Sequence, residues 1–128
     1  MSGHILIIED DPPSLALAQY LLHCAGHRTA AACDGPRGVE AALRDAPDLI
    51  LCDLQLPHLN GFEVLARLRA DRRWRRVPLI AVTASSMIGD REKVLKSGFD
   101  GYISKPIVPE AFVDQIESYL AAAISAPP

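Results

Sequence analysis

The chain has 128 residues, which is enough for one compact domain with its own core and too few for two ordinary domains. Apolar residues make up 49% of it and charged residues 23%, which excludes an intrinsically disordered chain. The net charge of −3 excludes the concentrated positive charge that binding to nucleic acid or to an anionic membrane requires, so we expect a single domain, residues 1–128 with a core from about 4 to 122, and no partner of either kind.

Five short runs rich in apolar and β-branched residues predict β-strands. In chain order they cover residues 4–9, 28–33, 49–53, 79–83 and 101–104. The first, third and fourth runs are apolar nearly throughout, which is typical of strands covered on both faces. These strands therefore belong in the middle of a layered structure.

Segments with helical periodicity alternate with the strands. They cover residues 14–25, 36–45, 61–70 and 87–96, and a last helix follows Pro109. Residues 87–96 offer little apolar surface, so we expect this helix to be the most mobile. The alternation of strands and helices predicts an α/β sandwich of five parallel strands with helices on both sides.

The remaining composition gives little sign of other functions. The N-terminus has no secretory leader and no segment has the length of a membrane span, so we expect a cytoplasmic protein. A short basic cluster at 72–76 is expected to be a solvated loop, with a contact to a partner as the alternative. The three cysteines show no C-x-x-C spacing and are expected to be reduced packing residues: Cys24, Cys33 and Cys52.

Polar residues follow the predicted strands at their carboxyl ends. Glu9 and Asp10 follow the first, Asp53 ends the third, Thr83 ends the fourth, and Lys105 follows the fifth. In an open parallel sheet, ligands bind at this edge. Each residue alone has an ordinary explanation, such as a helix cap, a turn or a surface ion pair. Together, three acids, a hydroxyl and an amine predict a functional site.

The three acids make a divalent cation the expected cofactor. At about 5 Å, each pair of carboxylates repels by about 3 kcal/mol in a medium of effective dielectric near 20. A proton or a cation must relieve this repulsion, and Lys105 supplies only one positive charge. Carboxylate oxygens without nearby Cys or His ligands favour Mg²⁺, to which the backbone carbonyl of Gln55 could add a ligand. Asp53 beside such an ion is a candidate nucleophile toward a phosphoryl group.

The motifs resemble those of the receiver domain of two-component response regulators. The matching segments are LIIEDD, the D-x-x-L-P-x-L-N-G run from Asp53 to Gly61, AVTA at Thr83, and YISKP with Tyr102, Lys105 and Pro106. They occur in the family's order and span essentially the whole chain. The resemblance implies a flavodoxin-like fold with strand order 2-1-3-4-5.

The resemblance also implies a function and a set of roles. Asp53 would accept a phosphoryl group from the phosphohistidine of a sensor kinase or phosphotransfer protein, with Mg²⁺ held by Asp10, Asp53 and the Gln55 carbonyl, and with Glu9 acting through water. Lys105 and Thr83 would bind phosphoryl oxygens, and the peptide bond before Pro106 would be cis. Such a domain is a signalling switch that assists its own phosphorylation and dephosphorylation, and is not a metabolic enzyme.

The family's response to phosphorylation implies a second set of roles. Thr83 would move toward the phosphoryl group and Tyr102 would swing inward. This would alter the face made by the fourth helix, fifth strand and fifth helix, which binds a downstream target protein. Because the chain ends where the domain ends, we expect a stand-alone receiver similar to the cell-cycle and chemotaxis regulators.

Four alternatives stay open on the residues alone. A receiver excised from a hybrid kinase or larger regulator would look similar, and a receiver that binds partners without phosphorylation would share the fold. A haloacid-dehalogenase-type hydrolase also uses an aspartyl nucleophile and Mg²⁺, but its D-x-D motif follows the first strand, and position 55 here is Gln. A flavin or nucleotide module would need a G-x-G-x-x-G turn or a P-loop, and Gly35 and Gly38 give only G-x-x-G.

Overall fold

The computed structural model describes residues 3–71, 77–84 and 90–125. Its five strands are all parallel and stand in the order β2-β1-β3-β4-β5, which confirms the predicted α/β fold and strand order. The strands are β1 (His4–Ile8), β2 (Arg28–Ala32), β3 (Leu49–Asp53), β4 (Leu79–Thr83) and β5 (Gly101–Ser104). The order reverses beside β1, so β1 and β3 flank the point where a parallel sheet binds its ligands.

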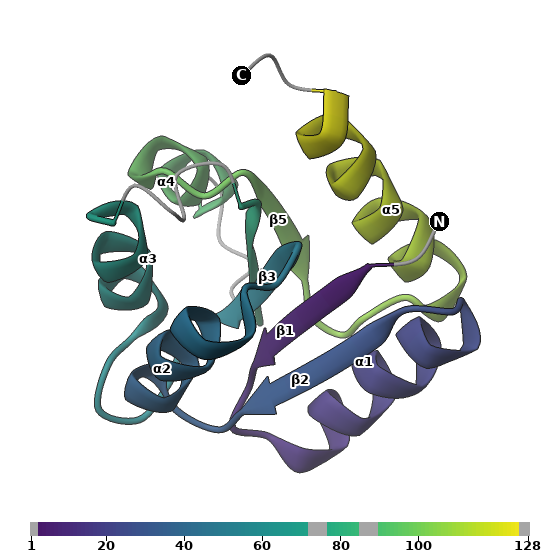
Figure 1. Cartoon of the computed structure of the whole chain (residues 1–128), viewed down its shortest axis with the longest axis horizontal. Coiled ribbons are helices and arrows are strands. Elements are labelled where there is room, and N and C mark those ends of the chain that lie inside the picture. The colour runs from purple at the N-terminus through teal and green to yellow at the C-terminus, as the bar shows by residue number, and fades with distance from the viewer. Residues whose placement is uncertain (1–2, 72–76, 85–89, 126–128) are drawn as a thin grey trace.

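Helices cover both faces of the sheet (Figure 1). On one face lie α1 (Pro12–Cys24) and α5 (Pro109–Ser125), and on the other lie α2 (Gly35–Asp45), α3 (Gly61–Arg69) and α4 (Asp90–Ser97). The central strands supply side chains to both layers in alternation. In β1, Ile5 and Ile7 pack with α1 and α5, whereas Leu6 and Ile8 pack with α2 and α3.

The predicted boundaries of several elements were wrong by one to two residues. β1 ends at Ile8 and β2 at Ala32, one residue before the predicted ends. α1 begins at Pro12 rather than Ser14, because Asp11 is its N-cap and accepts the Ser14 N–H at 3.1 Å. Asp11 therefore caps this helix, which leaves Asp10 available for another role.

The α4 helix and the cysteines were also predicted from the sequence. α4 begins at Asp90 and buries only Val94 among its residues; the first part of the predicted helix, 87–89, and the basic cluster at 72–76 lie outside the described residues. Cys24 and Cys33 are exposed, so only Cys52 is a packing residue as predicted. None of the helices in the described ranges combines the length and the apolar character that a bilayer crossing requires.

Candidate functional site

Glu9 and Asp53 lie side by side because of the register between β1 and β3. Ile8 is opposite Cys52, so the next residues along the two strands, Glu9 and Asp53, are neighbours. Both continue the alternation that points Ile7 and Leu51 toward α1 and α5. Their side chains therefore leave the same face of the sheet at its carboxyl edge.

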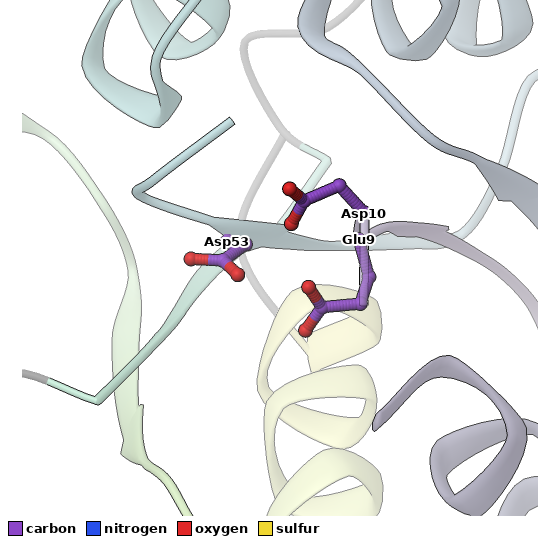
Figure 2. Close-up of side chains that lie close together, drawn as sticks. All are labelled: Glu9, Asp10 and Asp53. Carbon is purple, nitrogen blue, oxygen red and sulfur yellow. The ribbon is translucent and has the colours of Figure 1, made fainter. Parts of the chain in front are cut away.

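The three predicted acids form one cluster. Figure 2 shows the carboxylates of Glu9, Asp10 and Asp53 turned toward a shared space. One carboxylate oxygen from each of the three residues lies within 4.8 Å of the other two. Glu9 is only 5% exposed and Asp53 7%, whereas Asp10 is exposed. The cluster therefore has a buried side and an open side, through which a small ligand can enter.

Lys105 reaches the buried side of this cluster. Its ammonium nitrogen Nζ lies 2.9 Å from Asp53 Oδ2 and also pairs with Glu9 Oε1. The Lys105 N–H donates to the Thr83 carbonyl at 2.8 Å, which fixes the backbone just after β5 against the end of β4. The Lys105–Pro106 peptide bond is cis.

Burial and neighbouring charges together raise the pKa of both Glu9 and Lys105. Burial, reinforced by the neighbouring Asp53, raises the pKa of Glu9 to about 7, although the Lys105 ammonium opposes the shift. Burial also disfavours the charge on Lys105, but its ion pairs with Glu9 and Asp53 outweigh this and raise the pKa of Lys105 above its ordinary value. The site thus holds more negative charge than Lys105 alone can balance.

The loop after β3 orients the Asp53 carboxylate. The Gln55 N–H donates to Asp53 Oδ1 at 2.9 Å, so the two oxygens of Asp53 have different partners. Gly61 allows this loop to fold closely, because a Cβ there would lie 2.7 Å from the Asp53 carbonyl oxygen. The Gly61 N–H also donates to the Leu54 carbonyl at 3.0 Å. The carboxylate is therefore held from two sides.

Two contacts at the site were missed by the sequence reasoning. The Asp11 N–H donates to Glu9 Oε2 at 3.2 Å, so the residue that caps α1 also holds the Glu9 carboxylate. The backbone N–H of Gln55 donates to Asp53, whereas the sequence pointed only to the backbone carbonyl of Gln55. No side-chain pattern indicates either contact, because both come from backbone groups in tight turns.

Thr83 and Tyr102 lie on the two strands at the far side of the site. Thr83 is buried at the end of β4 and lines a cavity of about 520 Å³ together with Gln55 and Lys93. Tyr102 is half-buried on the edge strand β5 and packs against the layer that contains α4. Both residues therefore lie on the α4–β5 side of the molecule.

The residues of the cluster fit a hard divalent cation. Carboxylate oxygens from Glu9, Asp10 and Asp53 are the donors that Mg²⁺ prefers, and an exposed side leaves room for the waters that Mg²⁺ retains. Cys52, the nearest cysteine in sequence, is buried, and burial raises the pKa of its thiol, so a thiolate ligand is not offered here. The geometry thus provides a magnesium-type site beside a candidate nucleophile.

Comparison with known sequences identifies a single protein family. The sequence profile of the response regulator receiver domain matches residues 5–117. The polar-differentiation response regulators DivK of Brucella ovis and Brucella melitensis are each 39% identical over 123 residues, which cover 96% of this chain and 100% of theirs.

Solved structures show the same fold. The receiver domain of a sensor histidine kinase from Pseudomonas aeruginosa PAO1, crystallised with a magnesium ion in its active-site cleft, is 33% identical, with a TM-score of 0.85 over 94% of this chain and 99% of that one. The receiver domain of a signal transduction histidine kinase from Syntrophus aciditrophicus is 26% identical, with a TM-score of 0.87 over 98% of this chain and 95% of that one.

Proposed function

Since this chain belongs to the response regulator receiver domain family, whose members are signalling domains, we propose that it is a switch controlled by phosphorylation of Asp53. The observation that carries the proposal is the convergence of Glu9, Asp10, Asp53 and Lys105 at one edge of the sheet. Its phosphodonor is a histidine kinase or a histidine phosphotransfer protein, its output partner is a downstream target protein, and its compartment is the cytoplasm.

The transfer step requires an accessible carboxylate oxygen on Asp53. That oxygen attacks the phosphorus of a phosphohistidine, forming a P–O bond while the P–N bond breaks, and the electron pair stays on the imidazole nitrogen, which takes a proton from water. The Gln55 N–H and the Lys105 ammonium hold the Asp53 carboxylate for attack. Hydrolysis of the resulting acyl phosphate restores the carboxylate and releases inorganic phosphate.

Charge balance defines the role of the surrounding residues. Glu9, Asp10, Asp53 and the Gln55 carbonyl would hold Mg²⁺, directly or, for Glu9, through water. When bound, the ion neutralises charge on the incoming phosphoryl oxygens. Lys105 then turns from its two carboxylate partners toward a phosphoryl oxygen, and the Thr83 hydroxyl donates to another. This exchange of partners by Lys105 links phosphorylation to the ends of β4 and β5.

The response would pass through Thr83 and Tyr102 to the surface made by α4, β5 and α5. α4 buries only one of its own side chains, Val94, so a shift of this helix has a small packing cost. Movement of Thr83 toward the phosphoryl group leaves space that Tyr102 fills from the edge strand. The altered surface binds the target protein, which is the output of the switch.

Incubation with acetyl phosphate and Mg²⁺ tests the phosphorylation step. Intact-mass spectrometry should find one added phosphoryl group on the wild type and on Asp114→Asn, which removes an exposed acid from α5. It should find none on Asp53→Asn or when Mg²⁺ is replaced by excess EDTA. Equal labelling of wild type and Asp53→Asn would exclude Asp53 as the acceptor.

The identity of the phosphodonor needs a second experiment. Phosphotransfer from a panel of purified kinases should reveal one that labels Asp53 much faster than the rest. A receiver that is part of a hybrid kinase would share the chemistry of Asp53 but would be labelled fastest by the kinase core joined to it. Target binding that is equal for phosphorylated protein and Asp53→Asn would identify a phosphorylation-independent receiver.

A further inference from the structure

β2 is an edge strand, and half of its backbone groups face away from the sheet. The Arg28 N–H donates to the Gly3 carbonyl at 2.8 Å, and the Ala32 carbonyl accepts from the Glu9 N–H at 2.9 Å, so residues 28 and 32 point toward β1. In a parallel strand the direction alternates, which turns the N–H and C=O groups of Thr29, Ala31 and Cys33 outward. Within the described residues, no backbone group pairs with these three.

This edge lies open in a groove. A hollow of about 390 Å³ runs along Ala31 to Cys33, between Leu15 of α1 on one side and Arg37 and Arg44 of α2 on the other. Exposed edge strands are usually protected by Lys, Pro or a bulge. Between Arg28 and Asp34, this one carries only Thr, Ala and Cys, and its regular register with β1 shows no bulge. The edge is therefore available for pairing.

The sequence of the edge is self-complementary about Ala31. We propose that two copies of this chain pair antiparallel through β2, around a two-fold axis at Ala31, and so join their sheets. Ala31 then faces Ala31 of the second copy and Thr29 faces Cys33 of the second copy. Each such pair exchanges two hydrogen bonds, giving about six in all from the groups that point outward.

Charge favours this register. It places Arg28, whose N–H donates to the Gly3 carbonyl of the same copy, opposite Asp34 of the second copy, whose carbonyl accepts the Gly38 N–H of α2. Neither backbone bonds across the edge, so the two side chains come close across the pair. Arg28 is exposed. Asp34 uses Oδ1 to accept the Arg37 N–H at 2.8 Å, while Oδ2 lies 3.7 Å from the Arg37 guanidinium. The same two-fold axis repeats the opposite-charge pair at both ends of the strand.

On one side of β2, α1 permits this approach. Between Asp11 and Arg28, α1 and its following turn contain no Asp, Glu, Lys or Arg, so two copies of α1 meet without charge repulsion. Ala31 is small and Leu15 borders it, so apolar contact surrounds the axis. A two-fold pairing of this kind closes on itself as a dimer. A five-residue edge is short, so α1 and α2 must contribute to reach the roughly 800 Å² per partner of a stable interface.

Light scattering after size exclusion and amide exchange test the pairing without any phosphodonor, so their result is independent of the phosphorylation proposal. As concentration rises, the mass should increase from 13.9 kDa toward twice that value. The Thr29, Ala31 and Cys33 amides should become protected, while the Ala30 and Ala32 amides, which face β1, stay protected throughout. A protein that remains monomeric at every concentration overturns the proposal.

Two variants separate β2 pairing from any other dimer. Ala31→Pro removes an outward N–H that the sheet does not use, and Arg28→Glu places like charges opposite each other; both should stay monomeric with unchanged far-UV circular dichroism. Arg91→Glu, the same charge change on exposed α4, should dimerise as the wild type does. Should Ala31→Pro fail to fold, Arg28→Glu alone decides. Dimerisation of folded Ala31→Pro or of Arg28→Glu equal to wild type rejects the β2 interface.

Discussion

Lys105 is the residue on which the charge balance of the site depends. Its ammonium lies between Glu9 and Asp53, so one cation restrains two buried acids that neighbouring strands force together. Under the proposed function, Lys105 would exchange these carboxylates for a phosphoryl oxygen. Asp10, on the open side of the cluster, has no such ammonium contact among the described residues.

We predict that Lys105→Ala lowers the rate of Asp53 phosphorylation by acetyl phosphate about a hundredfold, because a cation that stabilises the transferring group is lost. Mg²⁺ affinity should stay the same or rise, because a positive charge that competes for the carboxylates is removed. Mass spectrometry gives the rate, and isothermal titration calorimetry with Mg²⁺ gives the affinity. Lys96→Ala, an exposed lysine on α4, is the control and should change neither. A variant phosphorylated at the wild-type rate would contradict the role of Lys105.

At the scale of elements, two helices end on alanine in different conformations. Ala46, at the C-cap of α2, is left-handed with φ 46°, whereas Ala70, at the C-cap of α3, is right-handed with φ −69°. A side chain disfavours the left-handed region, and glycine does not. The same substitution at these two positions therefore has opposite consequences.

We predict that Ala46→Gly raises the free energy of unfolding by about 0.5 to 1 kcal/mol, because relief of strain outweighs the added freedom of the unfolded chain. Ala70→Gly should lower it by a similar amount, because only the added freedom applies. Urea unfolding followed by circular dichroism measures both. Equal signs for the two variants would show that backbone strain at Ala46 is not significant.

The packing of α5 on β5 depends on a glycine. A Cβ at Gly101 would overlap the ring of Tyr119, so this ring of α5 occupies the space that a side chain at 101 would fill. We predict that Gly101→Ala destabilises the protein by about 1 to 3 kcal/mol through overpacking. The cost should fall in a Tyr119→Leu background, where the ring is absent. Strictly additive effects in this double-mutant cycle, measured by urea unfolding, would rule out the ring as the cause.

For the whole molecule, we expect the acid cluster to make stability depend on pH and Mg²⁺ together. The pKa of Glu9 rises from its ordinary 4.5 to about 7 on folding, so the folded state binds more protons than the unfolded state between these values. Without a divalent cation, the contribution of Glu9 to stability is therefore present at low pH and is lost as pH rises toward 7. A cation that binds the ionised cluster compensates for this loss.

We predict that the increase in melting temperature caused by Mg²⁺ grows with pH up to about 7 and then levels off. Thermal unfolding with Mg²⁺ or with EDTA, across a pH series, measures it. Asp114→Asn should retain the pH dependence, and Glu9→Gln should reduce it, because the titrating carboxyl is removed. A Mg²⁺ effect that is the same at acidic and neutral pH would contradict the link to Glu9.

The sequence by itself determined the order of the elements and which residues reach the carboxyl edge. Alternation of apolar strands with amphipathic segments predicted the parallel sheet. The site residues were identified because each ends or directly follows a strand: Glu9, Asp10, Asp53, Thr83 and Lys105. The sequence periodicity did not locate the ends of the helices, because capping side chains decide them. The Asp11 side chain starts α1 before Ser14, and apolar periodicity does not report a cap.

Only the tertiary structure decided which of these residues touch. The register of β1 on β3 makes Glu9 and Asp53 neighbours, and a shift of one residue would turn one of them to the other face of the sheet. Three contacts depend on how the loops pack at that edge: the ion pair of Lys105 with Glu9, and the hydrogen bonds that the backbone N–H groups of Gln55 and Asp11 donate to Asp53 and Glu9. Local sequence sets the periodicity of each element, but register and loop packing come from contacts between residues far apart in the chain, which is why the raised pKa of Glu9 emerges only in the folded protein.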